Sequence, residues 1–172
     1  MNFVFNTVYD MDALTAMARA VRKTSKGKYS KIRRIYIVTM IVLMILMVAL
    51  TLLLNKFNFK ILMLTLAGLA ILIAMKFEDR INAMLASKRV MKGAEKGVVT
   101  FGEDSYVSAT EVGTTEFKYS VIEAIAKRGD YIVFVFTRRH AQVYDLRAMS
   151  NGTPKEFCKF IQEKTGLEII KI

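Results

Sequence analysis

Two apolar runs dominate this chain: IYIVTMIVLMILMVALTLLL at residues 35–54 and ILMLTLAGLAILIAM at residues 61–75, separated by only six residues. A bilayer core of about 30 Å takes about 20 apolar residues to cross as a helix. The first run reaches that length without a charge, and phenylalanines on both sides extend the second. We therefore predict a two-helix transmembrane hairpin over residues 35–77, with helices at 35–54 and 59–77. A buried hairpin in a soluble protein is the alternative, but 172 residues offer little apolar surface to cover it.

The distribution of charge orients the predicted hairpin. Eight basic residues precede the first apolar run and six follow the second up to residue 96, whereas only Lys56 and Lys60 lie between the runs. Segments on the cytoplasmic side of a membrane are enriched in Lys and Arg. We therefore predict a multi-pass protein of the plasma membrane with both termini in the cytoplasm and the loop outside.

The basic residues before the first run are candidates for contact with anionic lipids. Each basic side chain near an anionic leaflet contributes about 1 kcal/mol of attraction. The alternative is that these residues determine topology alone. The predicted membrane-surface set is Arg19, Arg22, Lys23, Lys26, Lys28, Lys31, Arg33 and Arg34.

Small residues recur on the second predicted helix. Ala70 and Ala74 form a small-xxx-small pair, which permits two helices to approach closely, and Ala67 lies one turn earlier. We predict that Ala67, Ala70 and Ala74 pack against the first helix or against another protomer, and a homo-oligomer is therefore a possible state.

Two segments adjoin the hairpin. Residues 1–34 combine an amphipathic helix, which lies on the membrane or packs on the soluble domain, with the basic juxtamembrane segment. A short strand or membrane contact is expected at residues 3–5. Residues 78–96 read as a basic helical stalk that continues the second membrane helix, with Gly93 and Gly97 marking its end.

Residues 97–172 carry the pattern of a small antiparallel domain. Short alternating runs rich in β-branched and aromatic residues are separated by turn residues. The expected strands are 98–101, 106–110, 115–119, 121–127, 131–137 and 141–145. Thr153, Pro154 and Glu156 form a capping-box pattern, which predicts a C-terminal helix that ends at Gly166. The predicted fold class is α+β, a membrane hairpin followed by a β-sheet domain capped by an α-helix.

The sequence FKYSVIEAI at residues 117–125, the run YIVFVF at 131–136 and the capped final helix, following two membrane helices, resemble the bacterial YcxB-like membrane proteins. The resemblance implies that residues 97–172 form a cytoplasmic half-barrel similar to pleckstrin-homology (PH) folds. It also implies an inner-membrane location and a family whose role is largely unassigned.

The chain shows no catalytic constellation. Its one histidine, His140, lies in a basic turn, and its one cysteine, Cys158, borders the apolar stripe of the final helix. Metal, acid–base and thiol chemistry each need several convergent side chains. We therefore expect no enzyme activity, no metal and no cofactor. Arg138 and Arg139 are the one local basic pair of the domain and are candidates for headgroup or partner contact.

The charge balance bears on the partners. Residues 97–172 contain ten basic and ten acidic side chains, so the net charge of +11 belongs to the membrane flanks. A nucleic-acid-binding domain would carry the basic surface itself. We predict a non-enzymatic, membrane-anchored interaction or regulatory module that recruits an unknown protein partner. The alternative is an accessory or self-immunity subunit that acts through its hairpin.

Overall fold

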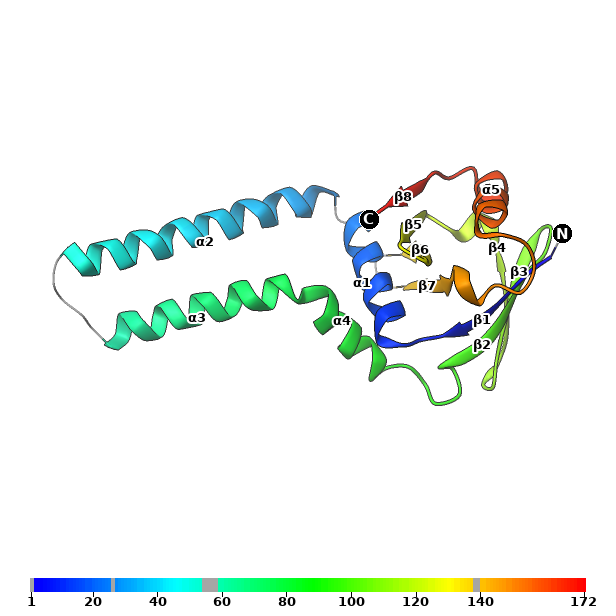
Figure 1. Cartoon of the computed structure of the whole chain (residues 1–172), viewed down its shortest axis with the longest axis horizontal. Helices are drawn as coiled ribbons and strands as arrows, with labels where there is room; N and C mark the ends of the chain where they lie inside the picture. The colour runs from blue at the N-terminus through cyan, green and yellow to red at the C-terminus, as the bar shows by residue number, and fades with distance from the viewer. Residues whose placement is uncertain (1, 26, 54–58, 138–139) are drawn as a thin grey trace.

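The computed structural model describes the chain except residues 1, 26, 54–58 and 138–139, and only the backbone of residues 25, 27–31, 33, 34 and 52 (Figure 1). Over this part of the chain the fold is α+β, with five α-helices and two β-sheets. The helices are α1 (Met11–Ser25), α2 (Gly27–Leu53), α3 (Phe59–Lys76), α4 (Glu78–Ser87) and α5 (Pro154–Thr165). The strands are β1 (Phe3–Val8), β2 (Lys96–Phe101), β3 (Ser105–Thr110), β4 (Gly113–Lys118), β5 (Ala124–Arg128), β6 (Tyr131–Thr137), β7 (His140–Asp145) and β8 (Ile169–Lys171).

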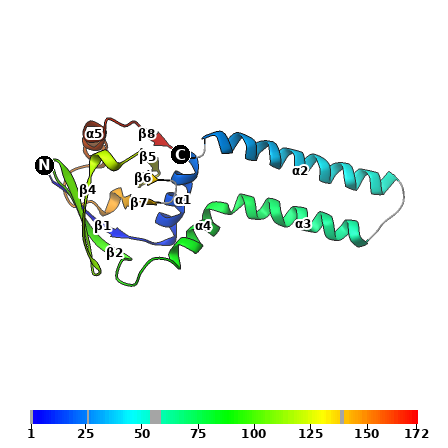
Figure 2. The ribbon, with the colours of Figure 1, turned by 180° about the vertical axis from the view of Figure 1, so that it is seen from behind.

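The molecule has two parts. Helices α2 and α3 run side by side away from the remainder, and we call this pair the hairpin (Figures 1 and 2). The two sheets with α1, α4 and α5 form the other part, which we call the sheet domain. Both chain ends lie in the sheet domain (Figure 1). The hairpin is therefore an insertion between the first and second strands of a domain that begins and ends the chain.

The first sheet has the order β1-β2-β3-β4 and is antiparallel throughout. The second sheet has the order β7-β6-β5-β8, in which β5, β6 and β7 are antiparallel and β8 runs parallel to β5. Each of the six predicted strands overlaps one of β2 to β7, and the predicted antiparallel arrangement is confirmed within β2-β3-β4 and within β5-β6-β7, which lie in different sheets. The strand predicted at 121–127 is wrong at its start, because Tyr119–Val121 form a 3₁₀ turn that leads the chain from one sheet to the other.

Of the short strand and the membrane contact expected as alternatives at residues 3–5, the structure shows a strand. Phe3 pairs with Phe101 and Phe5 with Val99, so β1 is a full antiparallel partner of β2. A bridge between Phe5 and Met149 also joins β1 to the segment that follows β7. The segment assigned from sequence to a separate N-terminal unit, residues 1–34, thus supplies one strand and one helix to the sheet domain.

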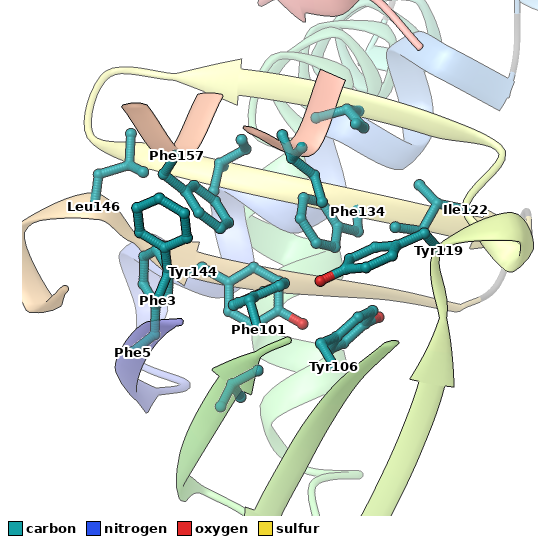
Figure 3. Packing of buried hydrophobic residues seen from close by; sticks show 14 of the residues in the cluster. Phe3, Phe5, Phe101, Tyr106, Tyr119, Ile122, Phe134, Tyr144, Leu146 and Phe157 are labelled. Atoms are coloured by element: carbon teal, nitrogen blue, oxygen red, sulfur yellow. The ribbon is translucent and has the colours of Figure 1, made fainter. Parts of the chain in front are cut away.

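An aromatic core lies between the two sheets and α5. Phe5, Phe101 and Phe157 are fully buried and meet one another with ring centroids 4.7–5.5 Å apart. Tyr144 and Phe134 enter the same cluster from the second sheet (Figure 3). Because buried rings contribute large apolar areas, this core is the main source of stability of the sheet domain.

Helix α1 covers the other face of the second sheet. Ala13, Ala16 and Ala20 are buried against Val133 and Val135 of β6. Small side chains on the helix allow it to lie close to the β-branched surface of the strand. Of the two alternatives for this helix, the structure shows packing on the sheet domain.

The C-terminal helix agrees with its predicted caps. The Thr153 hydroxyl accepts a hydrogen bond from the backbone of Glu156, and the Glu156 carboxylate accepts one from the backbone of Thr153. Pro154 occupies the first turn, and Gly166 ends the helix with a φ of 68°. The capping box and the C-terminal glycine are therefore confirmed.

The predicted stalk is only partly helical. The chain turns at Phe77, α4 ends at Ser87, and the segment up to β2 is irregular. Gly97 does not end a stalk, because it lies within β2, where an added Cβ would come within 2.6 Å of the Ala109 carbonyl oxygen. Close approach of β3, and not a helix end, accounts for this glycine.

Candidate functional site

The base of the hairpin is held together by contact between α1 and α4. Ala83 of α4 is fully buried where the two helices pack. Beside it, the Arg22 guanidinium donates two hydrogen bonds of 2.6 Å to the two carboxylate oxygens of Asp79. A bidentate pair of this kind is stronger and more directional than a single contact. The ends of the hairpin are thus joined on the side of the sheet domain.

Arg19 stands next to this pair. Its Nε lies 3.8 Å from the Asp79 carboxylate and is buried without a hydrogen-bond partner among the described residues. One carboxylate therefore faces two guanidinium groups. The hydrogen bonds with Asp79 raise the pKa of the Arg22 guanidinium, which therefore stays charged.

Two of the basic residues predicted to contact the membrane surface face α4. Arg22 and Arg19 face α4, where Asp79 offsets part of their charge, and Lys23 is exposed. Lys26 lies outside the described residues. For Lys28, Lys31, Arg33 and Arg34 only the backbone is described, so their contact with lipid stays a prediction.

The two hairpin helices pair along one stripe each. The less exposed positions of α2 and α3 recur with a spacing of three and four residues, the seam of an antiparallel coiled coil. They are Ile37, Met40, Met44, Met47 and Thr51 on α2, and Ile61, Thr65, Gly68, Leu72 and Met75 on α3. Gly68 is buried, and a Cβ there would lie 2.7 Å from the Met44 sulfur. A cavity of about 270 Å³ remains beside this contact.

The rest of the hairpin surface is apolar and uncovered. Large side chains such as Ile45, Leu46 and Leu64 are about 60% exposed. By length and composition, α3 is the one helix among the described residues that could cross a membrane, with a mean hydropathy of 2.0 and 6% of its residues buried. The apolar part of α2, Ile35–Thr51, is shorter. Both crossings of the predicted hairpin therefore stay predictions.

The predicted packing alanines lie outside the seam. Ala70 and Ala74 are exposed, and Ala67 is exposed beside the cavity between the helices. Ala70 and Ala74 are therefore not buried against α2. Gly68, which lies between Ala67 and Ala70 in the sequence, makes the close contact with Met44 of α2 instead.

A groove of about 700 Å³ opens between α1, α4 and the start of β7. Leu14, Met17 and Leu85 form an apolar part of its lining. Arg89 contributes a guanidinium group and His140 an imidazole. Arg138 and Arg139 precede His140 but lie outside the described residues. The groove is thus a mixed apolar and basic surface on the α4 side of the sheet domain.

A polar cluster lies inside the aromatic core. Tyr106 and Tyr144 donate hydrogen bonds of 2.9 and 2.5 Å to the side-chain oxygen of Gln142. Burial raises the pKa of both phenols, so the hydroxyls remain donors. Gln142 is 9% exposed, and we interpret this hydrogen-bonded cluster as one that fixes the orientation of the core side chains.

The remaining reactive side chains are dispersed. His140 is exposed at the start of β7, and Cys158 is half-buried against the core from α5. Burial raises the pKa of the Cys158 thiol, which disfavours the thiolate. Within the described ranges, no three His, Cys, Asp or Glu residues are grouped so that they could hold a metal ion.

Comparison of the chain with protein-family models, with curated proteins and with solved structures finds no match in any of the three.

Proposed function

We propose that this protein is a non-enzymatic, membrane-anchored interaction or regulatory module. In this proposal the hairpin crosses a bacterial inner membrane twice, and the sheet domain stands at its cytoplasmic surface. The observation that carries the proposal is the uncovered apolar exterior of a paired two-helix hairpin.

The outer surface of the hairpin is apolar. Leu, Ile, Val and Met side chains around both hairpin helices are exposed although the seam between the helices is closed. Soluble monomers rarely expose contiguous apolar patches of more than a few hundred Å². A core helix of a soluble protein would be mostly buried, whereas 6% of the α3 window is buried. A lipid environment accounts for this surface.

Helix length agrees with a bilayer. The 18 residues of α3 extend about 27 Å at about 1.5 Å per residue, close to the thickness of the hydrocarbon core. Helix α2 is longer, with 27 residues, and its N-terminal part carries the basic residues that suit the headgroup region. The positive-inside pattern favours a cytoplasmic sheet domain.

We further propose that the sheet domain is a PH-like, YcxB-like half-barrel. Its support is the arrangement of a four-stranded antiparallel sheet, a second sheet and a C-terminal helix that packs into the core between them. The hydrogen bond from the Ser150 backbone N–H to the Val4 carbonyl joins β1 of the first sheet to the segment that follows β7. The fold alone does not determine what such a domain binds.

The recruitment surface for an unknown protein partner is proposed at β4. This strand is the outer member of the first sheet, and Thr114, Thr115 and Glu116 on it are exposed. An exposed sheet edge can add a strand from a partner. Chemical crosslinking in native membranes, followed by purification of the full chain, is expected to recover a stoichiometric partner. A Thr114→Pro variant should lose it while an exposed control, Lys155→Gln, keeps it. Equal recovery with both variants would contradict β4 as the docking edge.

A second candidate is the accessory or self-immunity subunit. The exposure of Ala70 and Ala74 outside the hairpin seam favours it, because these small residues are left for contact with another membrane helix. An Ala70→Leu, Ala74→Leu double variant should then shift the assembly profile in mild detergent. Leu69→Ile, at an exposed neighbouring position, is the control. An unchanged profile for the double variant would exclude this candidate.

A further inference from the structure

Helix α4 has two different faces. Ala83 is fully buried, and Asp79 and Ala86 are partly buried, on the side that packs against α1. In both views α4 lies between α3 and α1 (Figures 1 and 2). The side chains on this inner face are small or acidic, which permits close packing and the bond to Arg22.

The opposite face of α4 is bulky, apolar and uncovered. Phe77, Ile81, Met84 and Leu85 are 38–48% exposed. At about 100° per residue, Phe77, Ile81 and Met84 lie on one side of the helix and Ala83 on the other. A helix on a soluble domain normally turns its apolar stripe toward the core. Here the apolar stripe faces away from the core. This orientation is the opposite of the one expected for a helix whose outer face is in water.

Basic residues accompany this outer face. Arg80 and Lys88 are each four residues from Met84, so they lie on the same side of α4, and both are exposed. Apolar side chains bordered by Arg and Lys are typical of helices that lie in a membrane interface. The amine and guanidinium groups can reach headgroup phosphates while their stems lie along apolar surface.

The position of α4 along the chain supports the same partner. Only Phe77 separates α4 from the end of α3, and the chain turns there. If α3 crosses the bilayer, α4 begins at the lipid–water boundary. The surface that α4 presents therefore continues the apolar surface of the hairpin.

We propose that α4 is an interfacial helix that rests on the lipid surface of the leaflet facing the sheet domain. Phe77, Ile81 and Met84 insert beside the acyl chains, Leu85 lies at the border with the groove, and Arg80 and Lys88 contact anionic headgroups. This inference rests on the proposed crossing of the bilayer by the hairpin. Because Asp79 and Ala83 attach α4 to α1, the sheet domain has a defined orientation on the membrane and does not swing on a free stalk.

The experiment places a fluorescent probe at single cysteines of the full chain in a Cys158→Ala background. The protein is reconstituted in vesicles of phosphatidylethanolamine and phosphatidylglycerol, with bromine either near the glycerol end or near the methyl end of the acyl chains. Met84→Cys and Ile81→Cys report on the outer face of α4. Asn82→Cys is the matched control, since Asn82 is exposed on the same helix but lines the groove. Leu66→Cys, exposed near the middle of α3, reports on the hairpin.

The proposal predicts that the fluorescence of probes at Met84 and Ile81 is quenched mainly by bromine near the glycerol end of the acyl chains. The fluorescence of the Leu66 probe should be quenched mainly by bromine near the methyl end. The Asn82 probe should not be quenched by either. Quenching at Leu66 without quenching at Met84 and Ile81 would overturn the interfacial helix and leave the membrane hairpin intact. Equal quenching at Met84 and Asn82 would overturn the proposed orientation of α4. No quenching at Leu66 would overturn the hairpin, and the inference with it.

Discussion

Arg22 of α1 and Asp79 of α4 are joined by two hydrogen bonds of 2.6 Å, although 57 residues and the whole hairpin separate them in sequence. The pair is partly buried, with 26% of the Arg22 side chain and 17% of the Asp79 side chain exposed. It closes the base of the hairpin and attaches α4 to the helix that covers the second sheet. The pair therefore couples the hairpin to the sheet domain.

Loss of this pair should destabilise the protein. An Asp79→Ala change leaves Arg22 and the buried Nε of Arg19 without their carboxylate, and the expected cost is about 1–3 kcal/mol of unfolding free energy. Denaturant unfolding of the full chain in mild detergent measures it. The control is Glu163→Gln, which removes the exposed Lys159–Glu163 pair and should change the unfolding free energy by less than about 1 kcal/mol. Equal effects of the two changes would contradict the role of Asp79.

Excision of the hairpin should leave a folded soluble domain. Arg22 and Asp79 touch, so a short Gly/Ser linker between Ser25 and Glu78 can replace residues 26–77 without strain. We expect near-UV circular dichroism and a cooperative unfolding transition from this variant. Residues 97–172 alone should lack both, because β1 supplies the buried rings of Phe3 and Phe5. Cooperative folding of that fragment would contradict the insertion of the hairpin into one domain.

The polar cluster of the core should behave as a unit. A Gln142→Leu change removes the acceptor of two buried hydroxyls and is expected to cost about 1–3 kcal/mol for each one left unsatisfied. Adding Tyr106→Phe and Tyr144→Phe removes those hydroxyls and should restore much of the loss. Denaturant unfolding of the wild type, the Gln142→Leu variant, the Tyr106→Phe, Tyr144→Phe double variant and the triple variant tests this coupling. Additive losses in the triple variant would indicate packing damage and not an unsatisfied hydrogen-bond network.

Stability near pH 4 should depend in part on Asp145. The hydrogen bonds from Arg147 lower the pKa of the Asp145 carboxyl below its ordinary value of 3.8. A lowered pKa in the folded state favours folding above 3.8, and this contribution is lost as the pH falls through the lowered value. Arg147→Gln should move the Asp145 titration, followed by NMR, up toward 3.8. Lys159→Gln is the control and should leave that titration unchanged. An unchanged titration in Arg147→Gln would contradict the assignment of the shift to Arg147.

Local patterns in the sequence predicted much of the sheet domain. Alternating runs located β2 to β7, and Thr153 with Glu156 located the start of α5, because period-two burial and helix capping depend on neighbouring residues. The length and composition of the apolar runs predicted helices α2 and α3. These features need no information about distant parts of the chain.

Contacts between distant segments escaped the same reasoning. The pairing of Phe3 with Phe101 and of Arg22 with Asp79 joins residues on either side of the hairpin, and no local pattern reports such a partner. Arg22 was assigned to lipid because neighbouring basic residues resembled a topology signal. The sequence pattern also did not predict that Ala13 and Ala16 form the buried face of α1, because alanine is a weak signal of an apolar helix face.

The proposed function requires a hairpin that crosses the membrane twice, with its loop outside and the sheet domain in the cytoplasm. The direct measurement is labelling of single cysteines with a membrane-impermeant maleimide in bacterial spheroplasts that express the full chain in a Cys158→Ala background. Lys60→Cys, at the loop end of α3, should be labelled in intact spheroplasts, and Thr115→Cys, on β4, only after the membrane is permeabilised. Labelling of both positions only after permeabilisation, or of both without it, would contradict a hairpin that crosses the membrane twice.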